Sequence, residues 1–253
     1  MIRVEHLTKV FDDKVVLEDI TCTFEKGKTN LIIGQSGSGK TVLLKSIVGL
    51  IEPTEGDVYY GDVNFTRLSF TEKKDIRKKI GMLFQGAALF DSATVEENVM
   101  FPLHMFTDMS DEEKRERANF CLKRVNVVNA NHLYPAEISG GMKKRVALAR
   151  AIVLNPDYLF CDEPNSGLDP QTSILIDQLI KEITEEFQTV TIVNTHDMNS
   201  VMGIGEKILF IHEGRKVWEG NNKEILSSDN EILNKFVFAN QMAMELKKAR
   251  GNK

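Results

Sequence analysis

The residues with the most specific chemistry form one octapeptide, GQSGSGKT at positions 34–41. It fits the pattern G-x-x-x-x-G-K-[ST], whose backbone N–H groups surround a phosphate. Its glycines let the chain turn around an anion without a Cβ clash. Lys40 supplies charge for the β- and γ-phosphates, and Thr41 supplies a hydroxyl for Mg²⁺. We therefore predict that a nucleoside triphosphate binds along Gly34, Gln35, Ser36, Gly37, Ser38, Gly39, Lys40 and Thr41.

The segments on either side of this loop are the elements that such a site needs. Residues 29–33 are typical of a short buried strand; Thr29 begins it, and we assign no ligand role to this residue. Residues 42–48 have the apolar spacing of a helix. A helix N-terminus at the end of the loop adds partial positive charge beside the phosphates. A chance glycine-rich turn, the alternative, would not predict this strand–loop–helix order.

Polar residues end three further apolar segments that we expect to be strands. Residues 158–163 end in Asp162 and Glu163. Since consecutive strand residues face opposite sides, the pair suggests two roles: Asp162 holds Mg²⁺, and Glu163 polarises the attacking water as general base. An acidic loop start is the alternative. Gln85 follows the strand at 80–84, where it could touch both metal and water, and His196 follows the strand at 189–194, within reach of a γ-phosphate.

A second helix terminus suited to an anion is predicted after residue 138. Ser139 can cap the following helix, and Gly140 and Gly141 leave its first N–H groups bare. This terminus has no lysine of its own. Taken alone, an ordinary cap is the simpler interpretation, and only the spacing from the phosphate loop favours an anion.

Two apolar features each leave two interpretations open. Phe11 lies in a predicted turn at 10–14 between antiparallel strands, where its ring could stack on a nucleotide base or simply form an edge of the core. Residues 86–106 are unusually apolar for a connecting region. They indicate either a docking surface for a partner or side chains that pack inside.

Composition and charge exclude several classes of function. The chain has 253 residues and a net charge of −5, which gives no support to a nucleic-acid-binding surface. Its three cysteines form no C-x-x-C pair and indicate reduced, structural thiols. We expect no leader peptide, because charged residues occur within the first nine positions, and no membrane span, because no run of 18 apolar residues occurs.

Together these motifs resemble the ATP-binding subunits of ABC transporters, in the expected order and over nearly the whole chain. The phosphate loop precedes a Q-loop glutamine, Gln85, and a signature at 139–141. The carboxylate pair follows, then a D-loop at 166–169 that ends in Asp169, and the switch residue His196. Phe11 occupies the place of the family's adenine-stacking aromatic, so the resemblance favours stacking over the core-edge interpretation.

One branch of the family is especially similar. Residues 84–92 (FQGAALFDS) and 139–145 (SGGMKKR) look like those of the ATPases of phospholipid, or "maintenance of lipid asymmetry", transporters. Ile138 and Met142 depart from the usual L-S-G-G-Q signature but leave its serine and glycines in place. Asn165 stands where a threonine is expected. The C-terminal helix is similar in placement to an extension that this branch uses for subunit contacts.

The resemblance implies an α/β fold: a RecA-like P-loop NTPase core with an N-terminal antiparallel β subdomain and an inserted α-helical subdomain. The ATP-binding domain would cover residues 1–220, with the helical insertion at about 86–150, and a C-terminal helical extension would cover 221–253. The cofactors implied are ATP and Mg²⁺, with the metal held by Thr41, Gln85 and Asp162. The catalytic residues implied are Glu163, His196, Lys40 and Gln85, and those implied to bind nucleotide are Phe11, the phosphate loop, Ser139, Gly140, Gly141 and Asp169.

The resemblance also implies partners. Two identical chains would hold two ATP molecules head to tail, each bound by the phosphate loop of one chain and by Ser139 and Gly141 of the other. An integral membrane permease would dock near Gln85 and residues 86–106, with lipid-binding and small regulatory subunits beside it and no nucleic acid. The chain would then lie at the cytoplasmic face of the inner membrane. Two alternatives stay open: a transporter of an amino acid, metal or drug, and a soluble ABC ATPase without a transport role.

Overall fold

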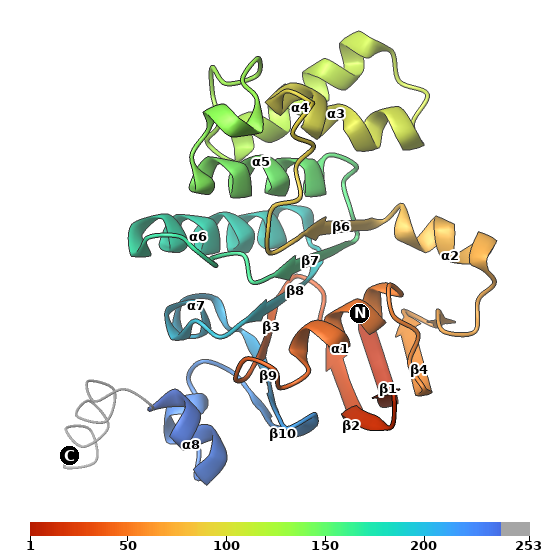
Figure 1. The fold of residues 1–253 in the computed structure, drawn as a ribbon, viewed down its shortest axis with the longest axis vertical. Helices are drawn as coiled ribbons and strands as arrows, with labels where there is room; N and C mark the ends of the chain where they lie inside the picture. The colour runs from red at the N-terminus through yellow and green to blue at the C-terminus, as the bar shows by residue number, and fades with distance from the viewer. Residues whose placement is uncertain (239–253) are drawn as a thin grey trace. The chain divides into compact units, whose positions relative to one another are not determined.

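The computed structural model describes residues 1–238, which form two compact units (Figure 1). The first unit comprises residues 1–25, 30–66 and the chain from 194 onward, and the second comprises 26–29 and 67–193. Part of the predicted extension at 221–253 lies outside the described residues. The proposed domain boundary at residue 220 stays a prediction.

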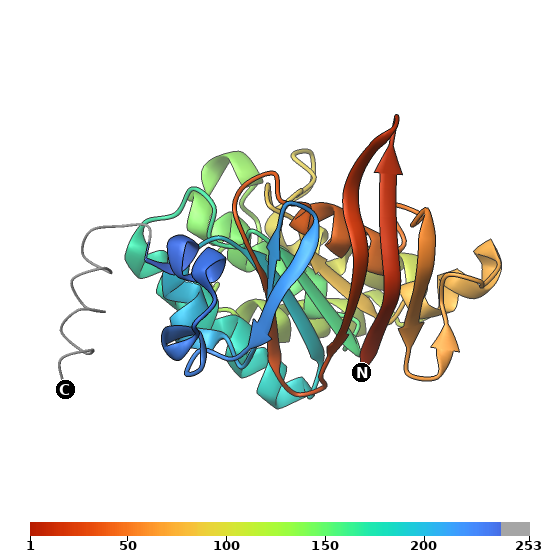
Figure 2. The ribbon, with the colours of Figure 1, turned by 90° about the horizontal axis from the view of Figure 1, so that it is seen from below.

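An antiparallel sheet opens the first unit. Its strands are β1 (Ile2–Phe11), β2 (Lys14–Phe24), β4 (Glu55–Tyr60) and β5 (Val63–Asn64), in the order β2-β1-β4-β5. Figure 2 shows β1 and β2 as two long neighbouring strands. Along β2 the side chains of Ile20, Cys22 and Phe24 are buried, while Thr21 is exposed. The alternation predicted from the sequence is therefore confirmed.

The first unit also contains the strand that leads into the phosphate loop. This strand, β3 (Thr29–Ile33), pairs in parallel with β9 (Lys207–His212), which forms a hairpin with β10 (Arg215–Gly220). Glu213 and Gly214 have φ values of 49° and 77°, the conformation of a two-residue primed turn, as the predicted hairpin requires. Among the described residues of this unit, the helical elements are α1 (Lys40–Val48), α7 (Met198–Ile204), a 3₁₀ turn at Ile225–Ser227, and α8 (Glu231–Val237).

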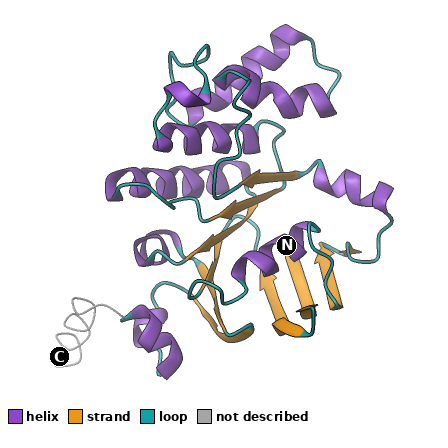
Figure 3. Cartoon of the chain, in the orientation of Figure 1, coloured by secondary structure: helices purple, strands orange, loops and turns teal. Residues whose placement is uncertain are grey.

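The second unit combines three neighbouring strands with five helices among its described residues. The strands are β6 (Ile80–Leu83), β7 (Tyr158–Asp162) and β8 (Val190–Thr195, whose last two residues belong to the first unit); β7 lies in the middle and is parallel to β6. The helices are α2 (Phe70–Arg77), α3 (Val95–Phe106), α4 (Asp111–Arg124), α5 (Gly140–Ile152) and α6 (Pro170–Phe187), with a 3₁₀ turn at Pro135–Glu137. Figure 3 shows α3, α4 and α5 grouped together.

Side-chain caps fix where several of these helices begin. Ser69, Thr94 and Ser110 each accept a hydrogen bond from the backbone N–H three residues later. In return the glutamate at that later position accepts a bond from the backbone N–H of the cap. Hydrogen bonds with the cap hold the pKa of all three glutamates below the ordinary value; the Ser69 side chain is the largest cause for Glu72, and the cap backbone is the largest cause for Glu97 and Glu113. The capping box predicted at residues 110–113 is confirmed.

The apolar region at 86–106 contains a helix, α3, which lies within the helical insertion that the resemblance implied at about 86–150. One face of α3 is buried, with Val95, Val99 and Leu103 in the core, whereas Phe101, Met105 and Phe106 are exposed. The interpretation that side chains of this region pack inside is therefore confirmed for one face of α3. Whether the exposed side chains form a docking surface stays a prediction. Over the described part of the chain, no helix combines the length and apolar character needed to cross a bilayer.

Candidate functional site

The phosphate loop joins the end of β3 to the start of α1, as predicted. Gly39 directly precedes α1 with φ of 103°, and a Cβ there would lie 2.7 Å from Leu17 Cδ2 and 2.9 Å from the Val16 carbonyl oxygen. Only glycine fits this position without strain. No side chain caps the start of α1. The loop therefore presents the uncapped helix N-terminus that phosphate-binding sites use.

Lys40 lies inside this loop. Its side chain is 5 % exposed, and its ammonium donates hydrogen bonds to the carbonyl oxygens of Gly34 (3.0 Å) and Gln35 (2.9 Å). Both bonds hold the charge at the centre of the loop, where a phosphate would bind. The local pattern therefore predicted both the loop and the place of its cation.

The end of β8 meets the phosphate loop within the first unit. The buried Asn194 donates a hydrogen bond from Nδ2 to Thr41 Oγ1, at 3.1 Å. His196, the predicted switch residue, follows two positions later and is exposed. Asn194 was not among the predicted site residues; an asparagine within a run of β-branched strand residues was the available signal.

Phe11 lies at the end of β1, and 41 % of its surface is exposed. The Lys9 ammonium lies 4.8 Å from the centre of the ring, in a cation–π contact. Part of the ring is thus accessible at the surface. Its stacking on adenine stays a prediction.

The carboxylate pair lies at the end of β7 in the second unit. Asp162 is the last strand residue and is buried, whereas Glu163 has φ of 47° and lies in a left-handed turn after the strand. The predicted strand alternation therefore does not apply to this pair, because Glu163 lies outside the strand. A non-glycine residue in this conformation is uncommon and marks a locally constrained backbone.

A buried lysine joins this turn to the Q-loop. The ammonium of Lys144, on α5, donates hydrogen bonds to the backbone carbonyl oxygens of Gln85 and of Glu163 (3.3 Å for the latter). The Gln85 side chain in turn donates from Nε2 to Ser166 Oγ, at 3.4 Å. The structure thus brings together the predicted Q-loop, general base and D-loop. Burial lowers the pKa of Lys144, against the opposing effect of Cys161, Asp162 and Glu163.

The signature residues form the start of α5. Ser139 Oγ accepts a hydrogen bond from the Met142 N–H, at 3.2 Å, so the predicted cap is confirmed. Ser139 and Gly140 are both exposed. A Cβ on Gly141 would lie 2.6 Å from Thr172 Cγ2 on α6, so glycine allows the two helix starts to pack closely. Whether this terminus binds a phosphate stays a prediction.

Asp169 has a clear structural role at the start of α6. Its Oδ1 accepts hydrogen bonds from the Gln171 and Thr172 N–H groups, each at 3.0 Å, and its Oδ2 accepts from Thr172 Oγ1 at 2.5 Å. The side-chain bond from Thr172 is the largest cause of a lowered pKa for Asp169. The predicted contact of Asp169 with nucleotide is not needed to explain its position.

The predicted magnesium ligands have suitable chemistry. Thr41, Gln85 and Asp162 offer hydroxyl, amide and carboxylate oxygens, which are the ligands that Mg²⁺ prefers. Among residues 1–238 there is no cluster of three or more His, Cys, Asp or Glu side chains that could hold a metal. The binding of Mg²⁺ by Thr41, Gln85 and Asp162 stays a prediction.

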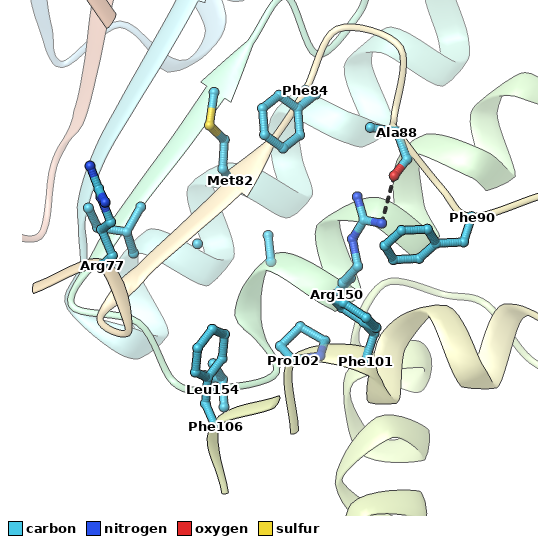
Figure 4. Close-up of a pocket in the computed structure, with 13 residues that line it drawn as sticks. Arg77, Met82, Phe84, Ala88, Phe90, Phe101, Pro102, Phe106, Arg150 and Leu154 are labelled. Carbon is cyan, nitrogen blue, oxygen red and sulfur yellow. Dashed lines mark hydrogen bonds between the residues drawn. The ribbon is translucent and has the colours of Figure 1, made fainter. Parts of the chain in front are cut away.

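A cavity of about 310 Å³ lies in the second unit beside the Q-loop (Figure 4). Aromatic side chains from α3 and from the segment between β6 and α3 line it, and Arg77 and Arg150 are its two cations. The Arg150 guanidinium donates to the carbonyl oxygens of Ala88 (2.7 Å) and Ala87 (2.8 Å). The aromatic residues are Phe84, Phe90, Phe101 and Phe106.

Fold and site together define an α/β protein with a phosphate loop of the nucleotide-binding type. A sequence model of the ABC transporter family matches residues 17–166. The chain therefore belongs to the ABC transporter family and is one of its ATP-binding, ATP-hydrolysing domains. The resemblance seen in the sequence is confirmed.

Curated relatives place the chain among ATP-binding subunits. The "Probable ribonucleotide transport ATP-binding protein mkl" of Mycobacterium bovis is 35 % identical over 93 % of this chain, which spans 66 % of that relative's length. The "Intermembrane phospholipid transport system ATP-binding protein MlaF" of Haemophilus influenzae is 37 % identical, with 91 % of this chain and 87 % of MlaF covered. The "Methionine import ATP-binding protein MetN" of Desulfitobacterium hafniense is also 37 % identical, with 97 % of this chain and 74 % of MetN covered.

Solved structures confirm the predicted fold class. A dimeric ATP-binding cassette in a post-hydrolysis state, bound to ADP and Pi, is 36 % identical to this chain with a TM-score of 0.80. The match covers 88 % of this chain and 99 % of that cassette. The α/β fold with a RecA-like P-loop core is thus the fold of an ABC ATPase.

Proposed function

We propose that this chain is the ATP-hydrolysing subunit that powers phospholipid transport through a separate membrane permease. The observation that carries the proposal is the similarity to MlaF, which extends over 87 % of that protein. The Q-loop and signature segments, 84–92 and 139–145, support the same branch. Since MetN is equally identical, transport of another cargo such as an amino acid is the second candidate.

Each predicted catalytic residue has a defined task in this proposal. Lys40 and His196 bind the γ-phosphate, and Glu163 accepts a proton from the attacking water. Gln85, the Q-loop glutamine, contacts the same attacking water. Thr41, Gln85 and Asp162 hold Mg²⁺, which stabilises the charge that develops on the phosphate oxygens.

The complete site is proposed to need two copies of the chain. Ser139 and Gly141 of one copy meet the γ-phosphate held by the phosphate loop of the other. The exposed start of α5 and the dimeric state of the solved cassette with ADP and Pi support this arrangement. ATP binding then closes the dimer, and product release opens it.

The cavity beside the Q-loop is the proposed docking site of the permease. An apolar segment of the permease would insert among Phe84, Phe90, Phe101 and Phe106, whose exposed fractions are 37 %, 44 %, 42 % and 52 %. Exposed aromatic groups around a hollow are typical of a partner surface. The chain would thereby be held at the cytoplasmic face of the inner membrane, with lipid-binding and small regulatory subunits in the same complex.

We expect Phe106→Asp to lower recovery of the permease with the tagged chain by about tenfold, because a carboxylate would be desolvated in the apolar contact. The measurement is quantitative mass spectrometry of the complex from gently solubilised membranes. Phe120→Asp is the matched control, since Phe120 on α4 is 48 % exposed and does not line the cavity. Equal losses in both variants would contradict docking at the cavity.

Affinity purification of the unmodified, tagged chain tests the cargo. Recovery of a multispanning permease with lipid-binding subunits is the expected result. An amino-acid or metal receptor in their place would keep the mechanism and change the cargo. Reproducible recovery of soluble partners alone would overturn the transport proposal.

A further inference from the structure

Lys144 occupies a position that the proposed chemistry does not use. Its side chain is 5 % exposed, one turn into α5 beyond the signature residues. Its hydrogen-bond acceptors are two backbone carbonyl oxygens, those of Gln85 and Glu163, which lie 59 and 19 residues away in sequence. A buried ammonium is costly to desolvate, so a lysine in this place has to recover that cost through its contacts.

The two carbonyls belong to segments with unusual backbones. Glu163 has φ of 47°, and its carbonyl oxygen also accepts a bond from the Ser166 N–H at 3.2 Å. In the Q-loop, Ala87 and Ala88 have φ of 62° and 49°. Left-handed conformations persist in non-glycine residues only when surrounding contacts impose them. The Lys144 ammonium is such a contact for the Glu163 turn and for the start of the Q-loop.

A second cation of α5 holds the far end of the same loop. Arg150 donates to the Ala87 and Ala88 carbonyl oxygens and lines the cavity beside the Q-loop, as Figure 4 shows for Arg150 and Ala88. The Q-loop is therefore attached to α5 at both ends. Of the two cations, Lys144 is the one that also reaches the turn carrying the proposed general base.

We propose that Lys144 is a positioning residue for ATP hydrolysis. It links the Glu163 turn to the Q-loop and to α5, the signature helix. The Glu163 carboxylate then reaches the attacking water only when the turn is held against both the Q-loop and α5. This inference rests on the proposed role of Glu163. Lys144 acts through the backbone of Glu163, whose carbonyl oxygen accepts its hydrogen bond.

The substitution Lys144→Met removes the N–H donors of the ammonium and leaves a side chain of similar length. We expect kcat for ATP hydrolysis to fall about tenfold, the effect of losing charge-assisted hydrogen bonds that position a reacting group. We expect the KM for ATP to change by less than about twofold, because the phosphate loop keeps its own contacts. Lys144→Gln, which keeps a donor, should recover part of the lost kcat. Lys181→Met, at a half-buried lysine on α6, is the control.

A double-mutant cycle separates positioning from a merely structural role. In the Glu163→Gln background, Lys144→Met should cause no further loss in single-turnover hydrolysis, because both changes act on the same base. The inference would be overturned if Lys144→Met caused a further tenfold loss in the Glu163→Gln background. It would also be overturned if the KM of Lys144→Met for ATP rose about as much as its kcat fell, or if both Lys144 variants kept the wild-type kcat. Near-normal turnover in Glu163→Gln alone would instead count against Glu163 as the base, so the two failures are distinguishable.

Discussion

Glu163→Gln should bind ATP normally and hydrolyse it at least about 100-fold more slowly than the unmodified chain, because a positioned general base contributes about 10²–10⁴-fold. Glutamine has nearly the shape of glutamate but cannot accept the water proton. The phosphate loop, with Lys40 and Thr41, is unchanged by the substitution. The measurements are steady-state phosphate release and equilibrium binding of ATP.

The same variant should accumulate as an ATP-bound dimer, since closure depends on ATP and opening depends on hydrolysis. Size-exclusion chromatography with ATP and Mg²⁺ reports this state. Glu112→Gln, at an exposed glutamate in the first turn of α4, is the matched control and should behave like the unmodified chain. Near-normal hydrolysis by Glu163→Gln would remove this residue as the base.

The features that the sequence predicted well are local ones. The phosphate loop, the hairpin through Glu213 and Gly214, and the Ser110 and Ser139 caps each depend on residues within a few positions of one another. Their side chains bond to the adjacent backbone, so spacing alone determines the geometry. The resemblance implied a helical insertion at about 86–150, and the same local signal could have located α3 within it, because Thr94 and Glu97 form a capping box. The nearly continuous apolar run and Pro102 concealed it.

The features that the sequence did not predict depend on contacts between distant segments. Asn194 and Thr41 are 153 positions apart, and Lys144 and Gln85 are 59 apart. No periodicity reports such pairs, and a lysine in a Lys-Lys-Arg run has the composition of a solvated surface. The prediction that the strand at 158–163 includes Glu163 was wrong, because contacts outside the strand hold Glu163 in a turn. The contacts that hold its left-handed backbone come from α5 and from Ser166.

Ser139→Arg should block hydrolysis while leaving the ATP affinity of the monomer intact. Ser139 is exposed at the start of α5, and the proposal places it against the nucleotide of the second copy. An arginine would fill that contact and keep the two copies apart. We expect the rate of phosphate release to fall at least about 100-fold, as when preorganised donors to a reacting phosphate are removed. Fluorescent-nucleotide titration at low protein concentration measures the monomer affinity.

The substitution also removes a helix cap, which costs about 1 kcal/mol of stability, so the control must share that loss. Ser110→Arg removes the equivalent cap of α4, where Ser110 Oγ accepts from the Glu113 N–H, away from the signature. It should retain most of its hydrolysis. If Ser139→Arg instead weakened ATP binding by the monomer, Ser139 would belong to the site of its own chain. The composite site formed by two copies would then be wrong.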